Sequence, residues 1–226
     1  MTALRLLTYN VRSMRDDRAA LGRVIRSAEA DVVLVQESPR FLRWRSLCAQ
    51  LARLGNLVVV GGGRRAGSNL ILSSLAVNVE STAEVLFSRD PGLHRRGTAI
   101  AVLTKQGARF AVAGIHLDLQ EAARRRHVTE LERAIEQHVP GGVPTIVAGD
   151  VNDIPGSPTW QALAAVRADA AADSGFTSSA REPHKRIDGV FVDPAIRVTA
   201  SRVLDQPDVV SASDHRPVLV ELELTP

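Results

Sequence analysis

The sequence predicts an α/β fold, and three features support this prediction. Near the N-terminus, apolar runs typical of buried strands alternate with segments whose apolar residues recur at helical spacing. Between residues 56 and 110, short β-branched or aliphatic runs are separated by glycine, which favours antiparallel strands. The 226 residues are enough to bury a full core within one domain. We therefore expect a single domain over residues 1–226.

The first quarter of the chain predicts two strand–helix pairs. Residues 4–11 form the first strand, and Asp17 precedes a helical pattern of four apolar residues. The apolar run 31–36 predicts a second strand. The Ser-Pro pair at residues 38–39 predicts the cap and first turn of a helix that continues to about residue 54.

The remaining elements follow from the same patterns. The predicted antiparallel meander consists of strands at residues 57–60, 69–72, 77–87 and 98–103. The later strands are predicted at residues 109–116, 144–148, 187–192, 196–204 and 217–224. Helices are predicted at residues 120–139 and from the Ser-Pro pair at 157–158, with an irregular segment from about residue 169 to 185.

Composition and charge exclude some classes of protein. No run approaches the roughly 20 apolar residues that a membrane span needs, and no signal peptide is recognisable, so we expect a cytoplasmic protein. The single Cys48 excludes an internal disulfide and a cysteine metal site. Only two of the 28 basic residues are lysines, so the pI of about 9.7 overstates a formal charge of +3. That charge does not establish a polyanionic partner, although clustered arginines would still form a local patch.

Polar residues stand at the ends of six apolar runs. A carboxylate in such a place is costly unless it meets a cation or a hydrogen-bond donor, so six such endings suggest one shared site. The residues concerned are Asn10, Glu37, His116, Asp150 with Asn152, Asp188, and Asp214 with His215.

Each ending has a simpler alternative when taken alone. Asp150 and Asn152 also suit an Asx turn, because Asn and Asp commonly end strands. Asp214 and His215 also suit a surface turn before the next strand, and His116 also suits a satisfied histidine on a half-buried strand.

Taken in order, six short motifs resemble the signatures of the endonuclease/exonuclease/phosphatase superfamily. The motifs are Leu7-Thr-Tyr-Asn10, Val35-Gln-Glu37, Gly114-Ile-His-Leu-Asp118, Gly149-Asp-Val-Asn152, Arg186-Ile-Asp188 and Ser213-Asp-His215. The resemblance covers essentially the whole chain. It implies a four-layer α/β sandwich, in which two mixed, mainly antiparallel sheets face each other with helices outside.

The resemblance also implies hydrolysis of a phosphate ester with a divalent metal, Mg²⁺ first and Mn²⁺ as the alternative ion. Glu37 would be the main metal ligand, with Asn10 in its shell and Asp214 as a ligand of this metal or of a second ion. Asp150 would position or deprotonate a water. Asn152 and the two histidines, His116 and His215, would contact the phosphate, and Asp188 would orient His215.

Other candidate contacts to the substrate rest on weaker signals. Asn69 and Arg96 lie in segments that resemble family loops near the phosphate, but solvated turns are the slightly favoured explanation of these segments. The stretch Gly61-Gly-Gly-Arg-Arg65 suits a phosphate-reading loop or, more simply, a flexible hairpin connection.

Three readings of the function remain open. The first is a phosphodiesterase, with DNA or RNA as the first substrates to test, in endonuclease or exonuclease fashion. The second is a phosphatase or phosphodiesterase for a small-molecule or lipid-derived phosphate, and the third is an inactive binding module on the same fold. No obligate protein partner is evident. His116 stands where exonuclease III-like repair enzymes usually carry Tyr, which makes an abasic-site endonuclease the weaker choice.

Overall fold

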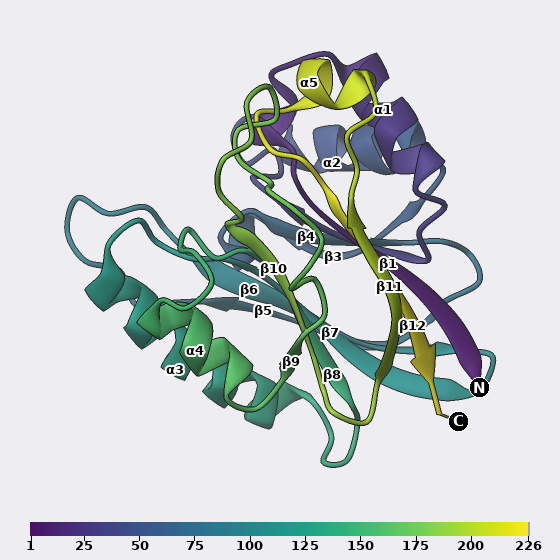
Figure 1. Cartoon of the computed structure of the whole chain (residues 1–226), viewed down its shortest axis with the longest axis vertical. Coiled ribbons are helices and arrows are strands. Elements are labelled where there is room, and N and C mark those ends of the chain that lie inside the picture. The colour runs from purple at the N-terminus through teal and green to yellow at the C-terminus, as the bar shows by residue number, and fades with distance from the viewer. Residues whose placement is uncertain (226) are drawn as a thin grey trace.

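Two six-stranded sheets face each other in the computed structural model, which describes residues 1–225 (Figure 1). The first sheet has the order β11 (Arg197–Val203), β12 (Val218–Leu224), β1 (Thr2–Asn10), β2 (Val32–Gln36), β4 (Asn69–Ser73), β3 (Val58–Gly63). The second has the order β5 (Asn78–Leu86), β6 (Gly97–Lys105), β7 (Ala108–His116), β8 (Thr145–Asp150), β10 (Asp188–Val192), β9 (Ala168–Asp169). Only β1 with β2 and β7 with β8 pair in parallel; the other neighbours are antiparallel.

Helices cover the outer face of each sheet. The first sheet is covered by α1 (Arg18–Ser27) and α2 (Trp44–Leu54), and α5 (Asp208–Ala212) packs beside α1. The second sheet is covered by α3 (Glu121–His138) and α4 (Pro158–Ala164). Two short 3-10 turns, Arg12–Met14 and Arg64–Ala66, follow β1 and β3. This is the predicted four-layer sandwich, with helices outside two mixed sheets.

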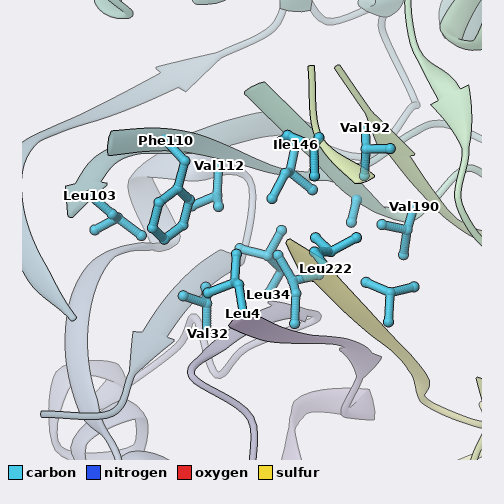
Figure 2. Close-up of a cluster of buried hydrophobic side chains, with 14 of the residues drawn as sticks. Leu4, Val32, Leu34, Leu103, Phe110, Val112, Ile146, Val190, Val192 and Leu222 are labelled. Carbon is cyan, nitrogen blue, oxygen red and sulfur yellow. The ribbon is translucent and has the colours of Figure 1, made fainter. Parts of the chain in front are cut away.

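The central strands are apolar on both faces because both faces are buried. In β1, Leu4 and Leu6 belong to the core between the sheets, whereas Leu7 and Tyr9 pack under the helices. Figure 2 shows the core between the sheets, where side chains of the first sheet such as Leu34 face side chains of the second. Uninterrupted apolar runs are the expected pattern for such strands.

Two of the predicted helix starts are confirmed by their caps. The Asp17 side chain accepts hydrogen bonds from the backbone N–H groups of Ala19 and Ala20 at the start of α1. Ser157 caps α4 by accepting the backbone N–H of Trp160, with Pro158 in the first turn. Both caps satisfy N–H groups that have no partner within the helix.

The predicted start of the next helix at residues 38–39 is wrong, because α2 begins only at Trp44. Glu37 has a φ of 51°, which turns the chain away from a helical path. The backbone N–H of Ser38 then bonds to the Ser68 carbonyl rather than starting a helix. Residues 38–43 therefore form a loop beside the ends of β2 and β4.

The predicted meander is also wrong, because its four strands are divided between the two sheets. β3 pairs with β4 in the first sheet, whereas β5 pairs with β6 in the second. The chain crosses from one sheet to the other between β4 and β5. Local β-propensity marks these strands but does not specify which sheet each one joins. Among the described residues, no helix is long and apolar enough to cross a membrane.

Candidate active site

The strand topology brings the polar strand endings to one end of the sandwich. β1 and β2 are parallel neighbours in the first sheet, where Asn10 pairs with Gln36 at their carboxyl ends. β7 and β8 are parallel neighbours in the second sheet, where His116 pairs with Asp150. Asp188 begins the antiparallel strand β10 directly opposite Asp150. Because the carboxyl ends of parallel strands share one edge of a sheet, these side chains meet where the two sheets adjoin.

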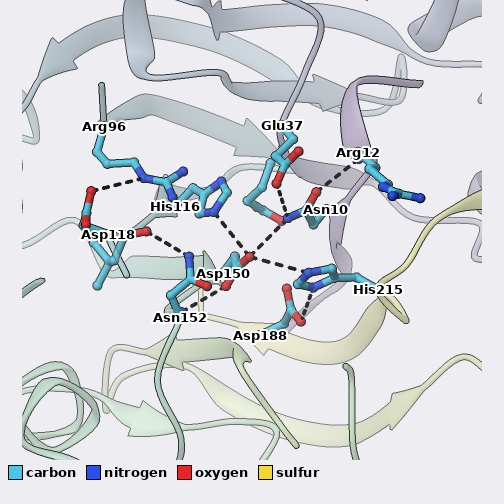
Figure 3. A network of polar contacts seen from close by, with 12 residues as sticks. Asn10, Arg12, Glu37, Arg96, His116, Asp118, Asp150, Asn152, Asp188 and His215 are labelled. Atoms are coloured by element: carbon cyan, nitrogen blue, oxygen red, sulfur yellow. Dashed lines mark hydrogen bonds and ion pairs between the residues drawn. The ribbon is translucent and has the colours of Figure 1, made fainter. Parts of the chain in front are cut away.

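Asp150 lies at the centre of this group (Figure 3). Its Oδ2 accepts a hydrogen bond from Asn10 Nδ2 at 3.1 Å, and lies 3.4 Å from His116 Nε2 and 3.8 Å from His215 Nε2. Its Oδ1 accepts the backbone N–H of Asn152 at 2.9 Å. One buried carboxylate therefore contacts side chains that come from both sheets.

The glycine before Asp150 permits this close arrangement. An added Cβ at Gly149 would lie 1.9 Å from the carbonyl oxygen of Ile115 on the neighbouring strand. No side chain fits in that space, so residue 149 must be glycine for β8 to run this close to β7.

Burial gives Asp150 an unusual affinity for a proton. Burial raises the pKa of Asp150, and the Asp188 carboxylate raises it further, to about 7. The charge of His215 and the hydrogen bonds from Asn152 and Asn10 act in the opposite direction. A carboxyl with such a pKa is suited to exchange a proton near neutral pH.

The surroundings of the two histidines favour different protonation states. Burial lowers the pKa of His116 well below its usual range, and the charge of Arg96 lowers it further, which favours the neutral imidazole. Burial also lowers the pKa of His215, but the carboxylates of Asp188 and Asp150 outweigh this effect and raise the pKa to about 10. His215 Nδ1 lies 2.9 Å from Asp188 Oδ2. Groups whose environments separate their pKa values in this way are suited to different proton-handling roles.

We expect the Asp188→Asn substitution to lower the pKa of His215 by about 1–3 pH units, because it removes the nearest charge that favours the imidazolium. NMR titration of the His215 ring in the presence of chelator measures this pKa directly. Asp205→Asn, at an exposed position, is the matched control and leaves the pKa unchanged. If the pKa of His215 in the Asp188→Asn protein equals that in the wild-type protein, the Asp188 carboxylate is not what raises it.

Glu37 and Asn10 form the predicted metal position. Asn10 Nδ2 donates to Glu37 Oε1 at 3.3 Å, so the Asn10 amide bridges the carboxylates of Glu37 and Asp150. The backbone N–H of Arg12 donates to Asn10 Oδ1 at 3.1 Å, which orients that amide. The positive φ of Glu37 is uncommon for a residue with a side chain, and such conformations cluster at functional sites.

The donor atoms fit a hard divalent cation. Mg²⁺ and Mn²⁺ prefer carboxylate and carbonyl oxygens, which is what Glu37 and its neighbours supply. Within residues 1–225, Asp188 Oδ1 is buried without a hydrogen-bond partner. The ligand atoms of Asp150, Asp188 and His215 also lie within 4.8 Å of one another and make a second group able to hold a cation. Carboxylates this crowded are stabilised by a shared proton or a cation.

Asp214 lies at the rim of the site. Its side chain is exposed, and its Oδ2 is 3.3 Å from Arg12 Nε. The preceding residue, Ser213, is buried and its Oγ donates to the Asn10 carbonyl oxygen at 2.7 Å. This bond ties the loop that carries Asp214 and His215 to the end of β1.

Asn152 is part of an Asx turn and also lies in the site. Its backbone N–H bonds to the Asp150 side chain, so the Asx turn that the sequence allowed is present. Its side-chain Nδ2 donates to the Leu117 carbonyl at 3.0 Å, and its φ is 53°. The turn and the site are therefore compatible, because the turn holds Asn152 beside Asp150.

A cavity of about 220 Å³ lies over Glu37 and His116. Arg96 lines this cavity, with its Nε 3.9 Å from Asp118 Oδ2. Asn69 does not line it: Asn69 is fully buried, and its Nδ2 donates to the carbonyls of Ala66 and Gly97. Its predicted contact with substrate stays a prediction; in the structure its side chain joins the turn Arg64–Ala66 to the start of β6.

Sequence reasoning missed three groups around this cavity, Ser13, Arg15 and Arg40. Ser68 and His94, which also line it, lie in the two segments that resemble family loops near the phosphate. The missed residues come from loops whose positions depend on tertiary packing, and none lies at the end of an apolar run. The usable signal for them was the excess of arginine in these loops. An anionic phosphate is favoured in a cavity where arginines outnumber the single lining carboxylate of Glu37.

Comparisons with known proteins agree with this geometry. Residues 7–215 match the family model described as the Endonuclease/Exonuclease/phosphatase family. No curated relative matches the chain at a significant level.

Solved structures share the fold over nearly the whole chain. A Bacteroides vulgatus endonuclease/exonuclease/phosphatase is 22% identical, with a TM-score of 0.83, and all of both chains is covered. A Bacteroides thetaiotaomicron mannosyl-6-phosphatase is 19% identical, with a TM-score of 0.83 over 98% of this chain and 100% of that one. TDP2 of D. rerio, in complex with a single-strand DNA product, is 16% identical, with a TM-score of 0.75 over 99% and 100% of the chains. At such identities these likenesses bear on the fold alone.

Proposed function

The chain belongs to the endonuclease/exonuclease/phosphatase family, and we propose that it is an Mg²⁺-dependent phosphoesterase that hydrolyses phosphodiesters. The observation that carries this proposal is the Asp150 carboxylate, which contacts Asn10, His116 and His215 at the junction of the two sheets. Members of the family hydrolyse phosphoester bonds, and these residues supply the proton-handling groups that such a reaction needs.

Glu37 would be the main ligand of the metal, with Asn10 beside it and Asp214 at the rim. A bound divalent cation supplies charge neutralisation for the phosphate and for the group that leaves. Mn²⁺ would serve as the alternative ion, because it accepts the same oxygen ligands.

Asp150 would orient a water and take its proton as the oxygen attacks phosphorus. Its raised pKa suits a group that accepts a proton near neutral pH. His215, protonated and held by Asp188, would donate a hydrogen bond to a phosphate oxygen. Asn152 and the neutral His116 would add further hydrogen bonds, with Arg96 supplying positive charge to the cavity.

Nucleic acid is the first substrate class to test. TDP2 of D. rerio binds a single-strand DNA product on this fold, which supports DNA or RNA as the polymer. A small phosphate ester is the second candidate, since the Bacteroides thetaiotaomicron relative is a mannosyl-6-phosphatase and the cavity over Glu37 holds only about 220 Å³. An inactive module is the least favoured reading, because every polar residue of the six motifs is retained. The cytoplasmic location and the single catalytic domain stay predictions.

A substrate panel tests this proposal. It compares plasmid DNA, single-stranded DNA, RNA, bis-nitrophenyl phosphate, nitrophenyl phosphate and inositol phosphates, each with Mg²⁺ and with chelator. We expect hydrolysis of the diesters only in the presence of the metal. Cleavage confined to the monoesters would contradict the diester assignment and favour the phosphatase.

A further inference from the structure

A second cavity of about 640 Å³ adjoins the one over Glu37. The two cavities share the lining residues Arg40, Gly67 and Ser68, so they are neighbours. We call the second cavity the arginine pocket, because its lining includes Arg40, Arg43, Arg64 and Arg95 and no acidic residue.

The arginine pocket is positively charged because its guanidinium groups lack acidic partners. Within residues 1–225, none of the four arginines forms an ion pair with a carboxylate, and every arginine that does lies outside the pocket lining. The four arginines each carry one positive charge, so their summed charge exceeds the formal net charge of the whole chain, which is +3. Clefts lined by one sign of charge concentrate ligands of the opposite sign.

Three segments that are distant in sequence build the pocket. They are the loop that ends at Arg43, the turn Arg64–Ala66, and the loop that carries Arg95. Gly67 lets two of them approach, because its φ is +65° and an added Cβ would lie 2.5 Å from the backbone nitrogen of Gly97. Arg43 itself has a φ of 59°, a cost that the surrounding structure must offset.

The wall of the pocket also carries an exposed aromatic ring. Phe41 is 68% exposed, and the guanidinium of Arg40 lies 5.3 Å from the centre of its ring. An exposed ring next to arginines is the combination with which proteins hold single-stranded nucleic acid, through base stacking and phosphate contacts.

We propose that the arginine pocket binds a second phosphate of the substrate, while the phosphate beside Asp150 is hydrolysed. The inference rests on the proposed function and narrows it to substrates with at least two phosphates. The exposed Phe41 ring can stack on a base, so we favour a nucleic-acid strand, in which the second phosphate is that of the neighbouring phosphodiester. An inositol polyphosphate offers the same chemistry without a base.

The test measures binding separately from turnover. Anisotropy of a fluorescent eight-nucleotide oligothymidine, with chelator and at several salt concentrations, gives the Kd of the wild-type protein, of Arg43→Gln/Arg64→Gln, and of a control. The control, Arg53→Gln/Arg133→Gln, loses the same charge at exposed positions that do not line the pocket. We expect the pocket variant to bind at least about tenfold more weakly and to lower the salt slope by about 0.7, the value for the loss of one phosphate contact on a single strand.

Turnover supplies the second readout. The ratio of kcat/KM for the oligonucleotide to that for bis-nitrophenyl phosphate should fall at least about tenfold in the pocket variant and stay constant in the control. Pocket and control variants with equal Kd values and equal ratios would overturn the proposal. If the wild-type protein binds the oligonucleotide through the pocket but hydrolyses no member of the panel, the pocket is supported and the proposed function is wrong.

Two further arms distinguish the source of the second phosphate. If the ligand is a strand, Phe41→Ala weakens oligonucleotide binding, and inositol hexakisphosphate competes poorly. If inositol hexakisphosphate displaces the oligonucleotide and Phe41→Ala has no effect, the second phosphate belongs to a small molecule.

Discussion

Substitution of Asp150 by Asn lowers kcat for the best substrate of the panel by about 1,000-fold, within the usual contribution of a general base. The amide keeps the size of the side chain and can still accept the backbone N–H of Asn152. It cannot take a proton from water, and it removes the charge that faces His116 and His215. The measurement is the steady-state rate at saturating Mg²⁺.

The matched control is Asp173→Asn, at an exposed aspartate outside the site. Circular dichroism and urea unfolding of both variants establish that the fold is retained. If the folded Asp150→Asn protein keeps more than about a tenth of the wild-type kcat, Asp150 is not the general base, since general bases contribute at least about 100-fold.

Substitution of Glu37 by Gln weakens metal binding at least about tenfold, the lower end of the losses seen when groups around a metal are removed. Gln retains a carbonyl oxygen but loses the charge that balances the cation. It also replaces the carboxylate to which Asn10 Nδ2 donates. We expect kcat at physiological Mg²⁺ to fall about 1,000-fold, because the metal supplies several kcal/mol of transition-state stabilisation.

Calorimetric titration with Mn²⁺ measures this affinity without substrate. Glu136→Gln, on the exposed face of α3, is the control and should bind the ion as the wild type does. Unchanged Mn²⁺ affinity in a folded Glu37→Gln protein would show that the ion is held elsewhere, with Asp150, Asp188 and His215 as the alternative ligands.

The elements that the sequence predicted well are those whose signals are local. The buried run of β2 and the Asp17 cap of α1 depend on neighbouring residues alone, and both are found as predicted. The start of α2 was misplaced because the Ser-Pro pair resembles a cap, whereas a backbone bond from Ser38 to Ser68 holds the chain in a loop. That bond joins residues far apart in sequence and leaves no local pattern.

The site could be predicted as far as it lies on strand ends. Asn10, Glu37, His116 and Asp150 meet because parallel strands open at one edge, which apolar runs ending in polar residues already indicate. Asp188 does not end an apolar run as predicted but begins β10, and it reaches the same edge because β10 is antiparallel to β8. The arginines around the two cavities come from loops whose meeting depends on packing. Asn69 shows that a polar residue near the site can have a structural role that its sequence does not reveal, since its side chain joins the turn Arg64–Ala66 to the start of β6.

We propose that one metal-dependent centre, built from Glu37 and Asp150, hydrolyses a phosphate ester. The most direct measurement is the initial rate of the wild-type protein on bis-nitrophenyl phosphate as Mg²⁺ is titrated into chelator-treated enzyme. We predict no detectable rate without the ion and a saturable rise as it is added. A rate that is independent of Mg²⁺ and of Mn²⁺, or no hydrolysis at any concentration of either ion, would contradict the account.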